Sequence, residues 1–172
     1  SGMGGVHFVP TDTTELPLLW RQRFPDWVRR DFCSFANPNG SITNSDLELA
    51  GSIAHNDVLA QAADVREKTN HHSYDNSAAV FWQRKGATTT LGLAAFLLQL
   101  QALHQSFFRY VPLRDYIPGP INAMADFLSR RWDLTDDQIL SHFNSHFPQN
   151  EPWQLCPLKT EMNSSLISAL SR

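Results

Sequence analysis

Three acidic residues occupy positions from which their carboxylates could meet at one site. Glu48 lies near the start of a helical pattern, Asp75 ends a short strand pattern, and Asp126 lies near the start of a later helix. In an open α/β fold, strand carboxyl ends and helix amino ends converge on one rim of the sheet. Carboxylates gathered there repel one another unless a cation lies between them, and hard oxygen ligands suit Mg²⁺. Two such ions about 4 Å apart can activate a water and stabilise the leaving oxygen of a phosphodiester.

Each of these carboxylates also has a purely structural explanation. The stretch 45–48 reads Ser-Asp-Leu-Glu, a capping-box pattern, so Glu48 could serve only to cap its own helix. Asp75 and the following Asn76 could form a strand-ending turn with a helix cap, and Asp126 could simply favour the dipole of its helix. Taken singly, each structural explanation is the stronger one, so spacing alone does not establish a catalytic site.

The elements that must position these side chains alternate between strands and helices. Strand patterns cover 6–9, 18–24, 31–36, 71–74 and 108–117, with a turn at 37–40. Helical patterns cover 25–30, 44–63, 77–83, 91–107, 122–131, 135–147 and, marginally, 161–170. The segment 148–159 has no regular pattern. This order of elements predicts an α/β fold.

The bulk composition limits the class of protein. The chain has 172 residues, of which 42% are hydrophobic and 18% are charged, as in ordinary globular domains. No stretch approaches the ~20 apolar residues that cross a bilayer, and no leader pattern opens the chain, so we expect neither membrane association nor secretion. Two widely separated cysteines favour a reducing, intracellular setting. The net charge of −3 argues against a freestanding nucleic-acid binder, so any such affinity should be local or supplied by a neighbouring domain.

The residues around the three carboxylates resemble motifs of type 1 ribonuclease H domains in retroelement reverse transcriptases. Residues 43–50, Thr-Asn-Ser-Asp-Leu-Glu-Leu-Ala, are similar to the first-helix motif, and 74–77, Tyr-Asp-Asn-Ser, resemble the fourth-strand motif. Residues 117–130 contain Pro-Gly-Pro-Ile-Asn-Ala-Met-Ala-Asp-Phe-Leu-Ser-Arg, which resembles the closing motif P-G-x-x-N-x-x-A-D-x-L-S-R. The order and spacing of the motifs match the family, and 82–86 and 131–134 resemble tyrosine-recombinase (DIRS-like) retroelements.

This resemblance implies a ribonuclease H-like mixed sheet flanked by helices over residues 1–134. Residues 135–172 would be a helical C-terminal extension or linker. Glu48, Asp75 and Asp126 would be catalytic and would bind two Mg²⁺ ions, with Mn²⁺ as a substitute, to hydrolyse the RNA strand of an RNA–DNA hybrid. The implied partners are that hybrid and a polymerase domain of the same polyprotein, with no small-molecule substrate.

The family also has a fourth carboxylate, on its first strand, in a motif of the form D-A-S-x-x-G-x-G. The start of the chain resembles this motif from Ser1 onward, with Val6 in place of the last glycine. The aspartate would then lie two positions before Ser1, outside this chain; the alternative is that the glycine-rich start is a remnant of an expression vector. Without that aspartate we expect weak metal binding and little or no activity. Asp12 and Asp31 are conceivable substitutes, although neither lies in the motif.

Four residues near the second motif are candidates for contacts with nucleic acid: Asn76, Trp82, Arg84 and Lys85. They could provide phosphate contacts and base stacking, or they could form a solvated helix end with an interface tryptophan. A second pair, His142 and His146, has a spacing that can hold zinc, but no third ligand accompanies it.

A function of a different class stays open. The domain could be a degenerate, non-catalytic ribonuclease H fold that links a polymerase to a recombinase or binds nucleic acid passively. The negative net charge and the absent first-strand carboxylate favour this alternative.

Overall fold

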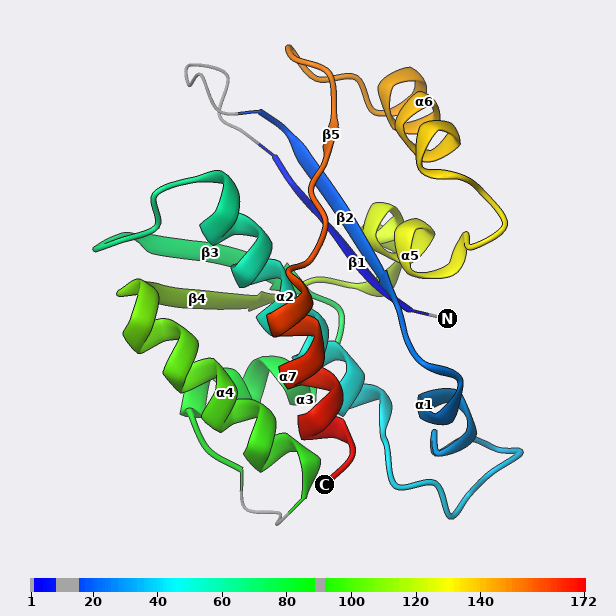
Figure 1. The fold of residues 1–172 in the computed structure, drawn as a ribbon, viewed down its shortest axis with the longest axis vertical. Helices are drawn as coiled ribbons and strands as arrows, with labels where there is room; N and C mark the ends of the chain where they lie inside the picture. The colour runs from blue at the N-terminus through cyan, green and yellow to red at the C-terminus, as the bar shows by residue number, and fades with distance from the viewer. Residues whose placement is uncertain (1, 9–15, 89–91) are drawn as a thin grey trace.

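The computed structural model describes residues 2–8, 16–88 and 92–172 and has a mixed α/β fold (Figure 1). Its strands are β1 (Gly2–His7), β2 (Leu18–Arg23), β3 (Thr69–Tyr74), β4 (Val111–Tyr116) and β5 (Gln154–Leu155). Its helices are α1 (Asp26–Arg30), α2 (Asn44–Ala62), α3 (Ser77–Lys85), α4 (Leu93–Phe108), α5 (Ala123–Arg130), α6 (Asp136–His146) and α7 (Thr160–Leu170). None of these helices combines the length and the apolar character that crossing a bilayer requires.

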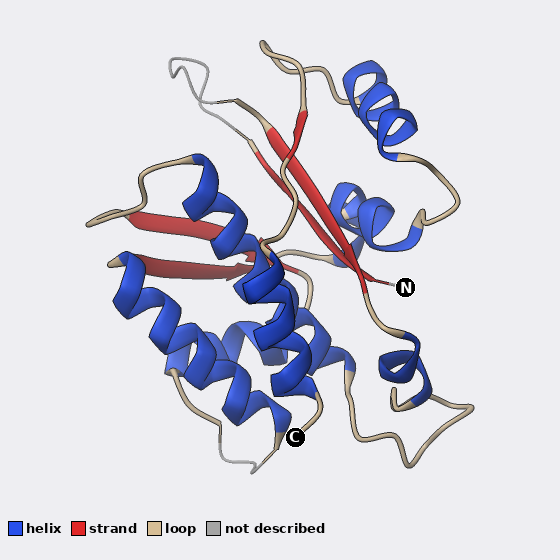
Figure 2. Cartoon of the chain, in the orientation of Figure 1, coloured by secondary structure: helices blue, strands red, loops and turns tan. Residues whose placement is uncertain are grey.

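The strands lie in two small sheets, which Figure 2 shows in red at an angle to each other. β1 pairs antiparallel with β2, and β2 pairs parallel with β5, so the three-stranded sheet is mixed. β3 and β4 form a separate parallel pair that runs in register from Thr69 opposite Val111 to Tyr74 opposite Tyr116. In the described part of the chain no ladder joins β1 to β3, and residues of both strands line one cleft.

Helices cover both faces of the three-stranded sheet. Successive residues of a strand point to opposite faces. In β2, Leu19 packs with Leu128 of α5 and Phe143 of α6, whereas Trp20 belongs to the core that contains α2. Figure 1 shows the same arrangement, with α5 and α6 on one side of β1 and β2 and with α2 and α7 on the other.

The glycine-rich start of the chain forms part of a strand rather than a lead-in to one. β1 begins at Gly2, whereas the sequence predicts a strand over 6–9, of which residue 9 lies outside the described residues. α5 lies so close to β1 that a Cβ on Gly4 would be 2.6 Å from the Cβ of Leu128. A glycine at this position therefore permits the contact between α5 and the strand.

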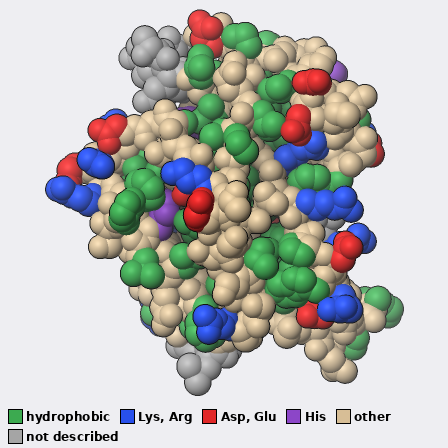
Figure 3. Space-filling model, viewed as in Figure 1, with side chains coloured by type: hydrophobic (Ala, Val, Ile, Leu, Met, Phe, Trp, Pro, Cys, Tyr) green, Lys and Arg blue, Asp and Glu red, His purple; other side chains and the backbone are tan. Residues whose placement is uncertain are grey.

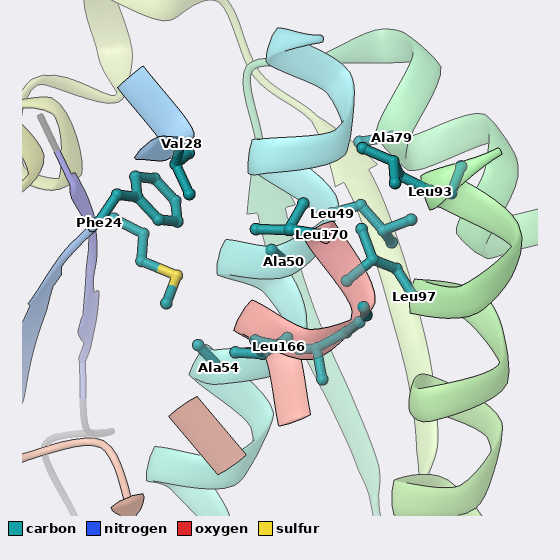
Figure 4. Close-up of a cluster of buried hydrophobic side chains, with 14 of the residues drawn as sticks. Phe24, Val28, Leu49, Ala50, Ala54, Ala79, Leu93, Leu97, Leu166 and Leu170 are labelled. Carbon is teal, nitrogen blue, oxygen red and sulfur yellow. The ribbon is translucent and has the colours of Figure 1, made fainter. Parts of the chain in front are cut away.

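The larger hydrophobic core lies between α2, α4 and α7 (Figure 4). Leu49, Leu97 and Leu166 come from these three helices in turn, and each is fully buried. Complete burial of a leucine contributes about 1.5–3 kcal/mol. The C-terminal helix, which the sequence predicts only marginally, is therefore an integral part of the core. The boundary predicted at residue 134 stays a prediction, but the residues beyond it contribute to both larger cores.

Two local predictions are wrong. Residues 31–36 form no strand and make only isolated bridges, from Phe32 to Ile42 and from Ser34 to Asn37. The predicted turn at 37–40 is present and folds this segment back before it can pair along its length. The segment 148–159, predicted to be irregular, contains β5, whose Gln154 N–H donates to the carbonyl oxygen of Pro17 at 2.9 Å.

Candidate active site

A cleft of about 1070 Å³ brings the three predicted carboxylates together. Glu48 lines it from the second turn of α2, Asp75 from the residue after β3, and Asp126 from the first turn of α5. Residues of β1 and β3 form opposite sides of this cleft. The carboxyl end of β3 and the amino-terminal turns of α2 and α5 thus converge, as the order of elements predicts.

The structure assigns the capping of α2 to Asp46 rather than to Glu48. Thr43 is the N-cap residue: its Oγ1 accepts a hydrogen bond from the backbone N–H of Asp46, with the heavy atoms 3.3 Å apart. The carboxylate of Asp46 in turn accepts from the backbone N–H of Thr43 at 2.9 Å. This capping box lies two residues before the one that Ser45 and Glu48 would form. Glu48 therefore has no capping role and lines the cleft instead.

The structure also bears on the structural explanations for Asp75 and Asp126. The cap of α3 is Asn76, whose Oδ1 accepts a hydrogen bond from the backbone N–H of Ala79 at 2.9 Å, so Asp75 is not needed as a cap. Asp126 does lie in the first turn of its helix, where a carboxylate favours the helix dipole. Its Oδ1 accepts a hydrogen bond from Nε of Arg130 at 2.6 Å. The structural explanations, a cap at Asn76 after Asp75 and the helix dipole for Asp126, therefore both stay open.

The three carboxylates are close enough to influence one another electrostatically. Burial raises the pKa of Glu48 from 4.5 to about 7; the negative charges of Asp75 and Asp126 act in the same direction, and the positive charge of Arg130 opposes them. A half-buried carboxylate beside two others thus keeps its proton up to neutral pH. A cation in this end of the cleft would favour the ionised form.

The donor atoms of the site are of the kind that bind a hard cation. Carboxylate oxygens are the ligands that Mg²⁺ prefers. Among the residues that the structure describes, however, no three His, Cys, Asp or Glu side chains form a group that could hold a metal ion. Of the two conceivable substitutes for the first-strand carboxylate, Asp12 lies outside the described residues, and Asp31 does not line the cleft.

The other end of the cleft is lined by histidines, which the sequence analysis did not connect with the site. His55 lies two turns after Glu48 on α2, and Trp20 Nε1 donates a hydrogen bond to its Nδ1 at 2.9 Å. The ring of His72 stands edge-on to that of His55, with centroids 4.7 Å apart. Burial lowers the pKa of His55 to about 3 and that of His72 well below its ordinary value. The seven-residue spacing from Glu48, which places both on one helix face, was the available signal.

None of the four predicted nucleic-acid contacts lines the cleft: Asn76, Trp82, Arg84 and Lys85. Beyond the capping role of Asn76, Trp82 is partly buried against the larger core. Arg84 donates from Nε to the carbonyl oxygen of Arg114 at 2.6 Å and pairs with Asp115 at 2.7 Å. Lys85 lies over the ring of Phe81. These contacts match the alternative of a helix end with an interface tryptophan.

The histidine pair of α6 belongs to an aromatic stack. His142 and His146 lie with ring centroids 4.2 Å apart, and the opposite face of His142 stacks on Phe127 at 4.4 Å. Packing therefore accounts for this pair without a metal.

Comparison with known proteins gave no match to a family model, to a curated protein or to a solved structure. The case for a function therefore depends on the residues of the cleft and on the motifs around them.

Proposed function

We propose that this chain is the catalytic part of a ribonuclease H-type nuclease from a retroelement reverse transcriptase. The single observation that carries the proposal is the meeting of Glu48, Asp75 and Asp126 in one cleft. They come from three elements far apart in the sequence, and the capping role that Glu48 could have had is filled by Asp46. The substrate is the RNA strand of an RNA–DNA hybrid, which such an enzyme distinguishes from DNA by its 2′-hydroxyl groups.

The residues of the cleft have complementary roles in this proposal. Glu48, Asp75 and Asp126 are the side chains that would hold Mg²⁺, which when bound supplies an activated water and neutralises charge on the scissile phosphate. Without a metal, burial and the neighbouring acids raise the pKa of Glu48 to about 7, so binding of Mg²⁺ near neutral pH would be accompanied by release of its proton. Arg130 orients the carboxylate of Asp126 through its Nε hydrogen bond and limits the repulsion among the three acids.

One observation favours the alternative of a non-catalytic nucleic-acid-binding or linking module. The net charge of the chain is −3, whereas a protein that holds nucleic acid usually has a basic surface. In that case the carboxylates would be remnants of a site, and the domain would act only through its surface.

Mg²⁺ binding to this chain separates the two functions. In a titration followed by the NMR signals of the side-chain carboxyl carbons, we expect weak binding that perturbs Glu48, Asp75 and Asp126 together. Asp75→Asn should abolish it. Asp133→Asn is the matched control, because Asp133 is exposed and pairs with Arg131 outside the cleft. Binding that survives Asp75→Asn, or no binding by the wild type, would contradict a metal site here.

Restoring the first-strand carboxylate tests catalysis directly. An Asp-Ala dipeptide added before Ser1 places an aspartate two positions upstream, and an Asn-Ala dipeptide is its control. The Asp-Ala chain should bind Mg²⁺ about tenfold more tightly, since one more carboxylate ligand completes the site, and should cut the RNA strand of a labelled hybrid. The Asn-Ala chain should do neither. An uncut hybrid with the Asp-Ala chain would overturn the nuclease proposal in favour of the passive module.

A further inference from the structure

The carboxylate end of the cleft continues onto a projecting arm, defined here as residues 26–40. Arg29 of α1 and Phe32 just after it line the cleft together with Glu48. Beyond them the chain leaves the body of the molecule as a loop and returns at the start of α2 (Figure 1). A ligand held at the carboxylates therefore lies next to the base of this arm.

The tip of the arm is a tight turn that presents a free aromatic ring. Ser34 and Asn37 exchange backbone hydrogen bonds of 3.0 and 3.1 Å, and Nδ2 of Asn37 donates to the carbonyl oxygen of Arg30 at 2.8 Å. The backbone N–H of Cys33 donates to the carbonyl oxygen of the buried Ile42 at 2.7 Å, which ties the loop to the core. Phe35, within the turn, is fully exposed (105%). Its backbone is held in place, so a partner need not order it on binding.

The arm also carries two exposed arginines, although Asp26 and Asp31 balance their formal charge. Arg29 and Arg30 are exposed at the end of α1. In the described part of the chain Arg29 has no carboxylate within ion-pair distance, and Arg30 reaches Asp31 only at 3.4 Å in an exposed pair. Exposed pairs of this kind contribute about 0–1 kcal/mol, so a phosphate could replace Asp31. Figure 3 shows basic and hydrophobic side chains together, with acidic ones between them, at the lower right over α1 and this loop.

A lone exposed phenylalanine is common and by itself indicates no partner. Here it is combined with two exposed guanidinium groups, of which only Arg30 has an ion pair with a described residue, and with Arg29 and Phe32, which line the same cleft as the carboxylates. Guanidinium groups bind phosphates, often through two hydrogen bonds. An aromatic ring can stack on a base only when the face of that base is free, which requires an unpaired nucleotide.

We propose that the arm binds a single-stranded extension of the nucleic acid held in the cleft, with phosphates at Arg29 and Arg30 and an unpaired base on Phe35. The proposal rests on the proposed function for the location of the duplex. It narrows the substrate class to a hybrid with a single-stranded overhang. The arm, rather than the residues of α3, then provides the local affinity for nucleic acid that the acidic chain requires.

The test compares a blunt RNA–DNA hybrid with the same hybrid carrying a single-stranded extension. Binding to fluorescein-labelled forms of both, measured by fluorescence anisotropy without divalent metal, reports on affinity without cleavage. The extended hybrid should bind about tenfold more tightly, since stacking of one base contributes about this much. Phe35→Ala should remove most of that preference, leaving only the part that Arg29 and Arg30 contribute, and should leave the affinity for the blunt hybrid unchanged. Phe81→Ala, at a ring 61% exposed on α3, is the matched control and should keep the preference.

The arginines are tested by the way in which the affinity for the extended hybrid depends on salt concentration. Each phosphate contact on a single strand contributes about 0.7 to the slope of log affinity against log salt concentration, so Arg29→Ala with Arg30→Ala should lower it by about 1.4. Arg66→Ala, at an exposed position after α2, should leave the slope unchanged.

Equal affinity for the two hybrids, or a preference that is undiminished in Phe35→Ala, would overturn the proposal. The Mg²⁺ titration with Asp75→Asn is independent of this outcome. The two experiments therefore distinguish a failure of the nuclease proposal from a failure of the proposal that the arm binds a single-stranded extension.

Discussion

The two ends of the cleft hold titratable groups on the same face of α2. Burial shifts the pKa values of these groups in opposite directions. At the carboxylate end burial raises the pKa of Glu48 to about 7, and at the histidine end it lowers the pKa of His55 to about 3. The physical cause is the same in both places, because a poorly solvated site disfavours whichever form carries charge. Both groups are therefore driven towards neutrality.

The neighbours of these two groups differ, and this difference indicates which end needs a ligand. Asp75 and Asp126 carry the same charge as ionised Glu48, so a cation would relieve a repulsion that Arg130 offsets only in part. At the other end the positive charges of His7 and Arg114 also keep the ring of His55 neutral. The hydrogen bond from Trp20 uses Nδ1 as an acceptor and so selects the neutral form with its proton on Nε2. The carboxylate end is suited to binding a cation, and the histidine end is stable without one.

The two ends also give the stability of the protein opposite dependences on pH. Between pH 4.5 and about 7 the folded chain binds the Glu48 proton more tightly than the unfolded chain, so stability falls as pH rises. Between pH 6.5 and about 3 the unfolded chain binds the His55 proton more tightly, so stability falls as pH falls. Substitutions at one end at a time are therefore needed to separate the two effects.

The largest effect is expected at the histidine end. Lowering the pH from 7 to 5 should reduce the free energy of unfolding by about 2 kcal/mol through His55 alone, because only the unfolded side chain takes up a proton. His72, whose pKa burial also lowers, acts in the same direction. His72→Phe removes two buried ring nitrogens that have no hydrogen-bond partner, and it should lessen the acid-induced loss. Urea denaturation at both pH values measures this; an unchanged loss in the variant would mean that His72 does not contribute.

At the carboxylate end the expected effect is of opposite sign, and it is smaller than the joint effect of His55 and His72. Glu48→Gln imitates the protonated side chain and should raise the free energy of unfolding at pH 8 by about 2 kcal/mol, a value reduced for partial exposure. At pH 4, where Glu48 is protonated in both states, the gain should disappear. Asp137→Asn, at an exposed acid of α6, is the control and should change little at either pH. A Glu48→Gln variant less stable than the wild type at pH 8 would show that the carboxylate has a structural role after all.

A substitution at Asp46, two residues before Glu48, distinguishes an acid that caps α2 from an acid that lines the cleft. Asp46→Ala removes the carboxylate that accepts from Thr43, and it should lower the free energy of unfolding by about 1 kcal/mol at pH 8. Glu48→Gln should have the opposite sign at the same pH. If both variants changed stability in the same direction, the division of roles between these two acids would be wrong.

The smallest expected effects concern the pKa of Glu48 itself. Asp126→Asn removes a negative neighbour and should move that pKa towards its ordinary value, whereas Arg130→Ala removes a positive neighbour and should raise it further. NMR titration of the Glu48 carboxyl carbon measures both shifts. Asp136→Asn, at an acid that pairs with Arg21 away from the cleft, should leave the titration of Glu48 unchanged. Shifts of the same sign in Asp126→Asn and Arg130→Ala would contradict the proposed neighbour relationships.

The sequence by itself determined most of the elements and the three carboxylates. Apolar spacing and caps act over a few residues, so α2, α3 and α6 lie close to where the patterns predict them. The end of α3 at Gly86 is also determined locally. The backbone φ of 65° at this position lies in the left-handed region, which glycine adopts without strain. The convergence of Glu48, Asp75 and Asp126 followed from their places at the ends of elements in an α/β order.

Only the tertiary structure determined the features that depend on contacts between residues distant in the sequence. The hydrogen bond from Trp20 to His55 joins residues 35 positions apart, and β5 exists only because its backbone pairs with β2. The marginal pattern of α7 became a core helix because α2 and α4 offer it an apolar surface. The exposure of Phe35 depends on a turn tied to the buried Ile42. Local patterns carry no record of such pairings, because their stability arises only when the chain has already brought the partners together.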